Sequence, residues 1–151
     1  MSCSHGGSHK QNSPGYCSRL KLTQDMSAVT AACLVIKRTM WDHVGGLDEG
    51  FAVAYNDVDL CLRLRDKGYR VIWTPFARLY HQESASRSYE HTPEKLARLN
   101  TEKAKLNKRW AKIINQDPYF NPNLSLTSTD CQLAFPPRGS LPWGANGNQT
   151  A

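Results

Sequence analysis

The sequence has no hydrophobic run long enough to cross a bilayer. Its longest apolar stretch, residues 28–36, is about half of the roughly 20 residues that a membrane-spanning helix needs. The first fifteen residues also lack the apolar segment of a secretory signal peptide. These absences predict a protein without a transmembrane segment, located in the cytoplasm, either free or peripheral at the inner face of the membrane.

The chain has no C-x-x-C pair, and its five cysteines are an odd, scattered number. This pattern argues against a disulfide scaffold and predicts reduced thiols. The histidines and cysteines of residues 1–19 match no common structural zinc spacing. Because these residues also lack a hydrophobic period, they are predicted to form a flexible polar tail.

No internal repeat is present, and a length of 151 residues fits one domain. Acidic residues are outnumbered, 13 Asp and Glu against 19 Lys and Arg, which gives a formal net charge of +6. Such a charge would suit a phosphate-bearing partner, but it is too diffuse to identify one.

Local patterns predict an α/β arrangement between the two ends of the chain. Residues 28–36 read as a buried strand, and a short helix follows Thr39 and ends at Gly45 and Gly46. A helix is predicted over residues 56–67, a strand over 69–73 and an amphipathic helix from Thr92 to Ile114. Residues 115–151, which hold most of the eight prolines, are predicted to be an irregular peripheral tail.

Two acids in the first turn of the predicted helix 56–67 are expected to point in different directions. Asp57 is in line with the apolar positions Leu60 and Leu64, whereas Asp59 is in line with Arg63. Asp59 is therefore expected to form an exposed ion pair with Arg63. Asp57, at the rim of a buried face, could act as a general base, or it could simply cap the helix.

An ordered set of motifs resembles the C-terminal, acceptor-side half of family 2 glycosyltransferases of the GT-A fold, most closely rhamnosyltransferase-like and O-antigen enzymes. The resemblance covers about residues 15–140. The motifs are Thr30-Ala-Ala-Cys, Gly45-Gly-Leu-Asp-Glu49, Asn56-Asp-Val-Asp-Leu-Cys-Leu-Arg-Leu-Arg65, Gly68-Tyr-Arg-Val-Ile-Trp-Thr-Pro75, His81 and a tail from Trp110 through Asp117-Pro-Tyr-Phe-Asn-Pro-Asn-Leu-Ser125.

The resemblance implies a role for each matching position in an inverting transfer from a nucleotide sugar to an acceptor hydroxyl. Asp57 would be the catalytic base, and His81 would bind a divalent metal, Mg²⁺ or Mn²⁺. Thr30, Asn56 and Asp59 would contact substrate. The family commonly has Glu where this chain has Asn56, an amide that can donate hydrogen bonds but carries no charge.

The resemblance also implies that part of the fold is missing. Only 29 residues precede Thr30, too few for an N-terminal, nucleotide-binding half built from several strand-helix units of about 30 residues each. Residues 20–114 are therefore expected to be a partial GT-A domain, inactive alone. Its sheet would have an open edge, through which it would meet a missing N-terminal half or a second copy.

Two other functions fit parts of the sequence. Bases between residues 103 and 112 could make a non-catalytic module for an acidic partner or nucleic acid, but without a stacking set of aromatics nucleic acid is not expected. A metal hydrolase using Asp57, Asp59 and His81 is disfavoured because the two aspartates lie on different faces of the helix.

Overall fold

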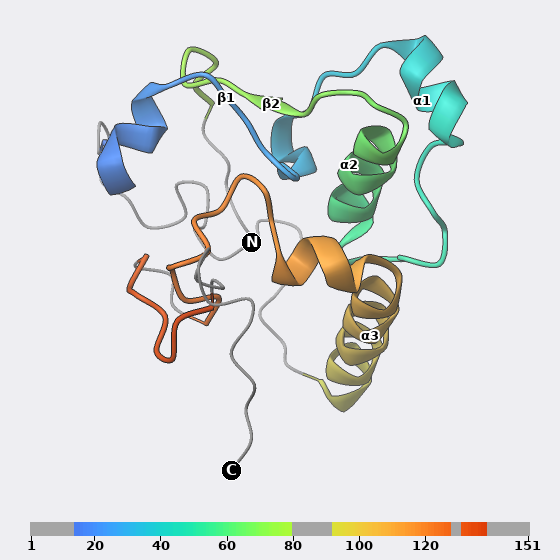
Figure 1. Cartoon of the computed structure of the whole chain (residues 1–151). Coiled ribbons are helices and arrows are strands. Elements are labelled where there is room, and N and C mark those ends of the chain that lie inside the picture. Colours follow the sequence, from blue (N-terminus) through green and yellow to red (C-terminus); the bar gives the residue numbers. More distant parts are fainter. Residues whose placement is uncertain (1–13, 80–91, 128–130, 139–151) are drawn as a thin grey trace, which may run out of the picture.

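The computed structural model of the chain describes residues 14–79, 92–127 and 131–138. Within these residues, helices pack beside one small sheet (Figure 1). The α-helices are α1 (Arg38–Val44), α2 (Asn56–Asp66) and α3 (Pro93–Asn115); the strands are β1 (Gln24–Asp25) and β2 (Ile72–Trp73); two 3-10 helices are η1 (Tyr16–Lys21) and η2 (Ala31–Cys33). This mixture is consistent with a partial α/β domain.

The predicted long helices are confirmed, and their ends follow from local chemistry. Helix α3 begins as expected, with Pro93 in its first turn and the Thr92 hydroxyl accepting a hydrogen bond from the Lys95 amide. After α2, Gly68 adopts a positive φ of 82°, which stops the helix. The cap position before α2 is occupied by Tyr55 rather than by Asn56, and Tyr55 has a left-handed backbone with φ 63°.

The predicted strands are largely wrong. Residues 28–36 contain the turn η2 instead of a buried strand, and Val35 is 93% exposed. Only Ile72 and Trp73 of the expected strand 69–73 are in β2, and β2 pairs with β1 in antiparallel register rather than in the expected parallel sheet. An apolar run becomes a strand only where another strand supplies hydrogen bonds, and in the described residues β2 meets one short partner.

The core lies between α2 and the segments that flank the sheet. Cys61 of α2 is fully buried and packs with Ala28 and Val71. Part of the segment after α3, expected to be peripheral, also joins the core, since Phe120 and Leu124 are buried. Burial of apolar surface on α2 thus stabilises its packing against the segments that contain Ala28 and Val71.

The described cysteines include both free and oxidised thiols. Cys17, Cys33 and Cys61 are free thiols, but Cys131 is disulfide-bonded, so the expectation of reduced thiols is wrong there. Among the helices that the structure describes, none has both the length and the apolar character required to cross a membrane.

Candidate functional site

The Asp57 side chain lies at the N-terminal end of α2, half-buried and facing the turn η2. Its Oδ2 accepts a hydrogen bond from the Ala31 amide at 3.0 Å, and its Oδ1 accepts one from the Val58 amide at 2.8 Å. The N-terminus of a helix favours negative charge, so the position suits an ionised carboxylate. The structure therefore places Asp57 where a carboxylate can meet both solvent and the segment that follows Thr30.

Thr30 and Asn56 are sequence neighbours of the two residues in this contact: Ala31 follows Thr30, and Asp57 follows Asn56. Thr30 caps η2, and its exposed hydroxyl accepts a hydrogen bond from the Ala32 amide at 3.3 Å. Asn56 Oδ1 accepts a hydrogen bond from the Asp57 amide at 2.8 Å. The structure thus brings the turn after Thr30 and the start of α2 together, as a shared site requires.

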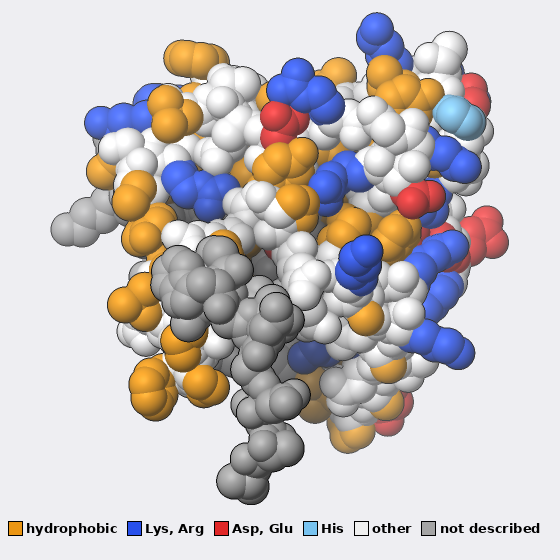
Figure 2. Space-filling view, viewed as in Figure 1, with side chains coloured by type: hydrophobic (Ala, Val, Ile, Leu, Met, Phe, Trp, Pro, Cys, Tyr) orange, Lys and Arg blue, Asp and Glu red, His pale blue; other side chains and the backbone are white. Residues whose placement is uncertain are grey.

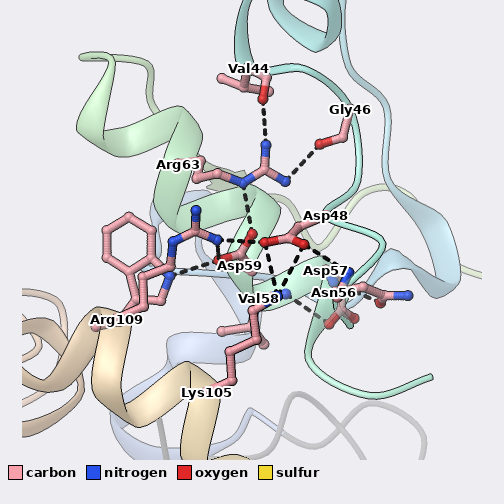
Figure 3. A network of polar contacts seen from close by, with 12 residues as sticks. Val44, Gly46, Asp48, Asn56, Asp57, Val58, Asp59, Arg63, Lys105 and Arg109 are labelled. Carbon is pink, nitrogen blue, oxygen red and sulfur yellow. Dashed lines mark hydrogen bonds and ion pairs between the residues drawn. The ribbon is translucent and has the colours of Figure 1, made fainter. Parts of the chain in front are cut away.

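Asp59 lies on the opposite side of α2 and is fully buried. Its carboxylate pairs with Arg63 at 2.7 Å and with Arg109 at 3.0 Å (Figure 3). It also accepts a hydrogen bond from the Trp110 indole at 2.9 Å. The predicted ion pair with Arg63 is confirmed, but its predicted exposure is wrong, because the Asp59 side chain is 0% exposed. Asp59 therefore contacts protein groups in a position closed to solvent.

A second carboxylate extends this network into the loop between α1 and α2. Asp48 pairs with Lys105 at 3.1 Å and with Arg109 at 2.8 Å, both from α3. Its pKa is lowered to about 2, chiefly because the Gly50 amide and the Lys105 ammonium donate hydrogen bonds to it. Figure 3 shows the Arg109 guanidinium in contact with the carboxylates of both Asp48 and Asp59.

Glu102 is a buried acid that is not among the site residues predicted from the sequence. Its side chain is 4% exposed, and it accepts hydrogen bonds from the backbone amides of Val53 at 3.3 Å and Ala54 at 2.7 Å. The sequence carried one indication that Glu102 faces the protein. Residues 102, 105 and 109 lie on the same face of α3 as the predicted apolar position Leu106. That face, rather than a free basic surface, is the contact side of α3.

The expected metal site cannot be assembled from the described residues. His81 lies outside them, and among them no group of three His, Cys, Asp or Glu side chains is arranged to hold a metal ion. Asp48 and Asp59 are already neutralised by basic side chains, and Asp59 points away from Asp57. The described residues therefore do not fit a complete cation site.

A cavity of about 290 Å³ lies elsewhere, between residues 34–37 and 69–72. Its lining is mainly apolar and includes Cys61 and Leu64 of α2, but neither Thr30 nor Asp57. Among the described residues, the sequence-predicted site thus lies outside this cavity.

Several proteins are similar to this chain in sequence. Protein y4gI of Sinorhizobium fredii, whose function is uncharacterised, is 54% identical over 123 residues, which are 81% of this chain and 14% of that protein. The O-antigen biosynthesis protein RfbC of Myxococcus xanthus is 41% identical over 111 residues, which are 74% of this chain and 8% of that protein.

A third relative carries a name that states its reaction. N-acetylglucosaminyl-diphospho-decaprenol L-rhamnosyltransferase of Mycobacterium tuberculosis is 33% identical over 58 residues, 38% of this chain and 19% of that enzyme. The chain thus spans between 8% and 19% of the length of these three relatives. No protein-family model and no solved structure matches the chain. Its sequence relationship is glycosyltransferase-like, through relatives named for O-antigen biosynthesis and rhamnosyl transfer.

Proposed function

We propose that this chain is the acceptor-side part of an inverting family 2 glycosyltransferase with the GT-A fold. The observation that carries the proposal is the half-buried Asp57 carboxylate at the start of α2, 3.0 Å from the Ala31 amide in the turn after Thr30. The names of the relatives support sugar transfer in polysaccharide synthesis. The substrates proposed are a nucleotide sugar and the hydroxyl of a sugar acceptor.

In the proposed reaction, Asp57 acts as general base. Its carboxylate takes the proton of the acceptor hydroxyl while the acceptor oxygen forms a bond to the anomeric carbon. The bond from that carbon to the diphosphate oxygen breaks on the opposite face, and the nucleoside diphosphate leaves with the electron pair. The Ala31 amide would hold the Asp57 carboxylate in place, and Thr30 and Asn56 would contact the acceptor.

We also propose that His81 is one ligand of a divalent cation, Mg²⁺ or Mn²⁺, in the complete enzyme. The cation would neutralise the departing diphosphate. Because the described residues offer no complete cation site, the ligands besides His81 would come from outside them. We therefore assign the described residues to the acceptor and to proton transfer.

The alternative of a basic binding module is not favoured. Lys105 and Arg109, two of the bases on which it rested, are paired with Asp48, and Arg109 also contacts Asp59. Figure 2 shows Lys and Arg side chains spread over the visible face among acidic and hydrophobic side chains, without one continuous basic surface. The named relatives also point to sugar transfer rather than to nucleic-acid binding.

The test is a chimera in which the 111 matching residues of RfbC are replaced by those of this chain. Release of nucleoside diphosphate would be measured with a nucleotide sugar and an acceptor. Asp57→Asn should lower kcat by about 10² to 10⁴, because a general base is lost while the side chain keeps its size.

The matched control is Asp66→Asn, at the exposed C-terminal end of the same helix. It removes the same charge and should leave kcat within about twofold of the parent chimera. If Asp57→Asn folds normally by circular dichroism and keeps the activity of the parent, Asp57 is not the base.

A further inference from the structure

Helix α3 holds both ends of the loop between α1 and α2. Near the start of the loop, Asp48 pairs with Lys105 and Arg109; near its end, the amides of Val53 and Ala54 donate to Glu102. Positions 102, 105 and 109 are separated by three and four residues, so their side chains leave the same face of α3. Two turns of one helix therefore fix a loop through contacts between residues that are 48 to 61 positions apart in sequence.

The Glu102 contact is specific to a buried carboxylate. A buried charge is costly unless it is hydrogen-bonded, and here each carboxylate oxygen has its own donor: Oε1 faces the Val53 amide and Oε2 faces the Ala54 amide. A glutamine of the same size could accept only one of these bonds, because its amide nitrogen would face the second donor.

The amides held by Glu102 immediately precede a strained turn. Tyr55 has φ 63° and ψ 4°, a left-handed conformation that is unfavourable for a residue with a side chain. Such strain persists only where neighbouring contacts determine the backbone. Asn56 and Asp57 follow directly, so the direction of the Asp57 side chain depends on this turn.

We propose that Glu102 is a positioning residue for Asp57. By fixing the amides of Val53 and Ala54, it holds Tyr55 in the left-handed conformation, and that conformation aims the Asp57 carboxylate at the Ala31 amide. The catalytic consequence rests on the proposed function. The positioning itself does not, because it can be measured in the 151-residue chain without any substrate.

The experiment compares Glu102→Gln with Glu49→Gln by amide hydrogen exchange. Glu49 is an exposed acid in the same loop, so its substitution removes the same charge without touching these amides. In Glu102→Gln, exchange at Val53 and Ala54 should accelerate by about tenfold or more, and exchange at Ala31 should accelerate with it. Amides of Leu62 and Leu64, in the buried part of α2, should keep their rates, as they would not if the whole fold were weakened. In Glu49→Gln, all these rates should stay within about twofold of the parent.

A second variant covers the case in which Glu102→Gln does not fold. Lys105→Met removes the contacts of the ammonium group with Asp48 and with the Phe51 ring. It leaves Asp48 paired with Arg109, and Asp59 paired with Arg63 and Arg109. It should accelerate exchange at Ala31 in the same direction, to a smaller extent. The proposal is overturned if loop exchange accelerates in a folded variant while the Ala31 amide keeps its parental rate.

Kinetics separates this proposal from the proposed function. In the chimera, Glu102→Gln should lower kcat about ten- to a hundredfold with little change in KM, as expected for a misplaced base. A changed Ala31 exchange rate together with full activity of Asp57→Asn would leave the positioning intact and remove the catalytic role. An unchanged Ala31 exchange rate in Glu102→Gln together with an inactive Asp57→Asn would support the catalytic role of Asp57 and overturn the positioning role of Glu102.

Discussion

Asp57 and Asp59 are separated by one residue on α2, yet their carboxylates bind opposite parts of the molecule. The Asp57 carboxylate accepts a hydrogen bond from the Ala31 amide, and the Asp59 carboxylate pairs with Arg63 and Arg109. The first is half-buried and the second is fully buried. Replacing each aspartate by asparagine should therefore change the free energy of unfolding by different amounts.

We expect Asp59→Asn to lower the free energy of unfolding by about 3–5 kcal/mol, because it leaves Arg63 and Arg109 without their buried counter-charge. Asp57→Asn should cost about 1 kcal/mol, the value of one partly exposed hydrogen bond. Urea unfolding followed by circular dichroism measures both. Equal losses for the two variants would contradict the division of roles.

The salt bridges of Asp48 with Lys105 and Arg109 should make the free energy of unfolding depend on pH. The pKa of Asp48 in the folded chain is about 2, below that of an unfolded aspartate, so the bridges contribute fully above about pH 4. Their contribution should be lost as the pH falls from about 4 to about 2, and it should amount to about 1 kcal/mol because the pairs are partly exposed.

The control for this pH dependence is Asp48→Asn, which removes the titrating group. Unfolding of the parent and the variant at a series of pH values should give two curves that differ above pH 4 and converge toward pH 2. A constant difference over the whole range would show that the bridges do not titrate there.

Cys61 should be the slowest of the free thiols to react. Burial raises its pKa and leaves it 0% exposed, whereas Cys17 and Cys33 are exposed. Alkylation with iodoacetamide at pH 8, followed by mass spectrometry, should show Cys61 modified at least about tenfold more slowly than either exposed cysteine. Comparable rates at the three positions would mean that α2 opens readily.

Gly45 and Gly46 should tolerate alanine to different extents. Both have positive φ, 75° and 68°, so either substitution should cost about 1–2 kcal/mol in backbone strain. A Cβ at Gly45 would meet open space, but one at Gly46 would lie 3.0 Å from the Trp41 indole nitrogen. Gly46→Ala should therefore lose about 1–3 kcal/mol more than Gly45→Ala in urea unfolding, and equal losses would exclude this steric contribution.

The sequence predicted those parts of the fold that depend on neighbouring residues. Helices α2 and α3 were predicted because caps, glycines and apolar periodicity act within a few residues. The strand at 28–36 was wrong because strand formation depends on a pairing partner, which an apolar run does not reveal.

The candidate site divides in the same way. The opposite directions of Asp57 and Asp59 follow from helical spacing, and the structure confirms them. The burial of Asp59 could not be predicted, since its partners Arg109 and Trp110 come from a helix about 50 residues later. The contact of Glu102 with two loop amides likewise depends on how α3 packs, and its helical position alone does not indicate it.

The pairing of Asp59 with Arg109 has a consequence for how this sequence can change over generations. Replacing Arg109 alone leaves the buried Asp59 carboxylate with its Arg63 pair, and replacing Asp59 alone leaves Arg109 with its Asp48 pair. Each single replacement therefore weakens a buried ion-pair network, and selection for stable folding would act against it. Accepted replacements at positions 59 and 109 should therefore occur together, although the two residues are 50 positions apart in sequence. Covariation between these two positions in an alignment of homologues would reveal the contact between α3 and α2 from sequences alone.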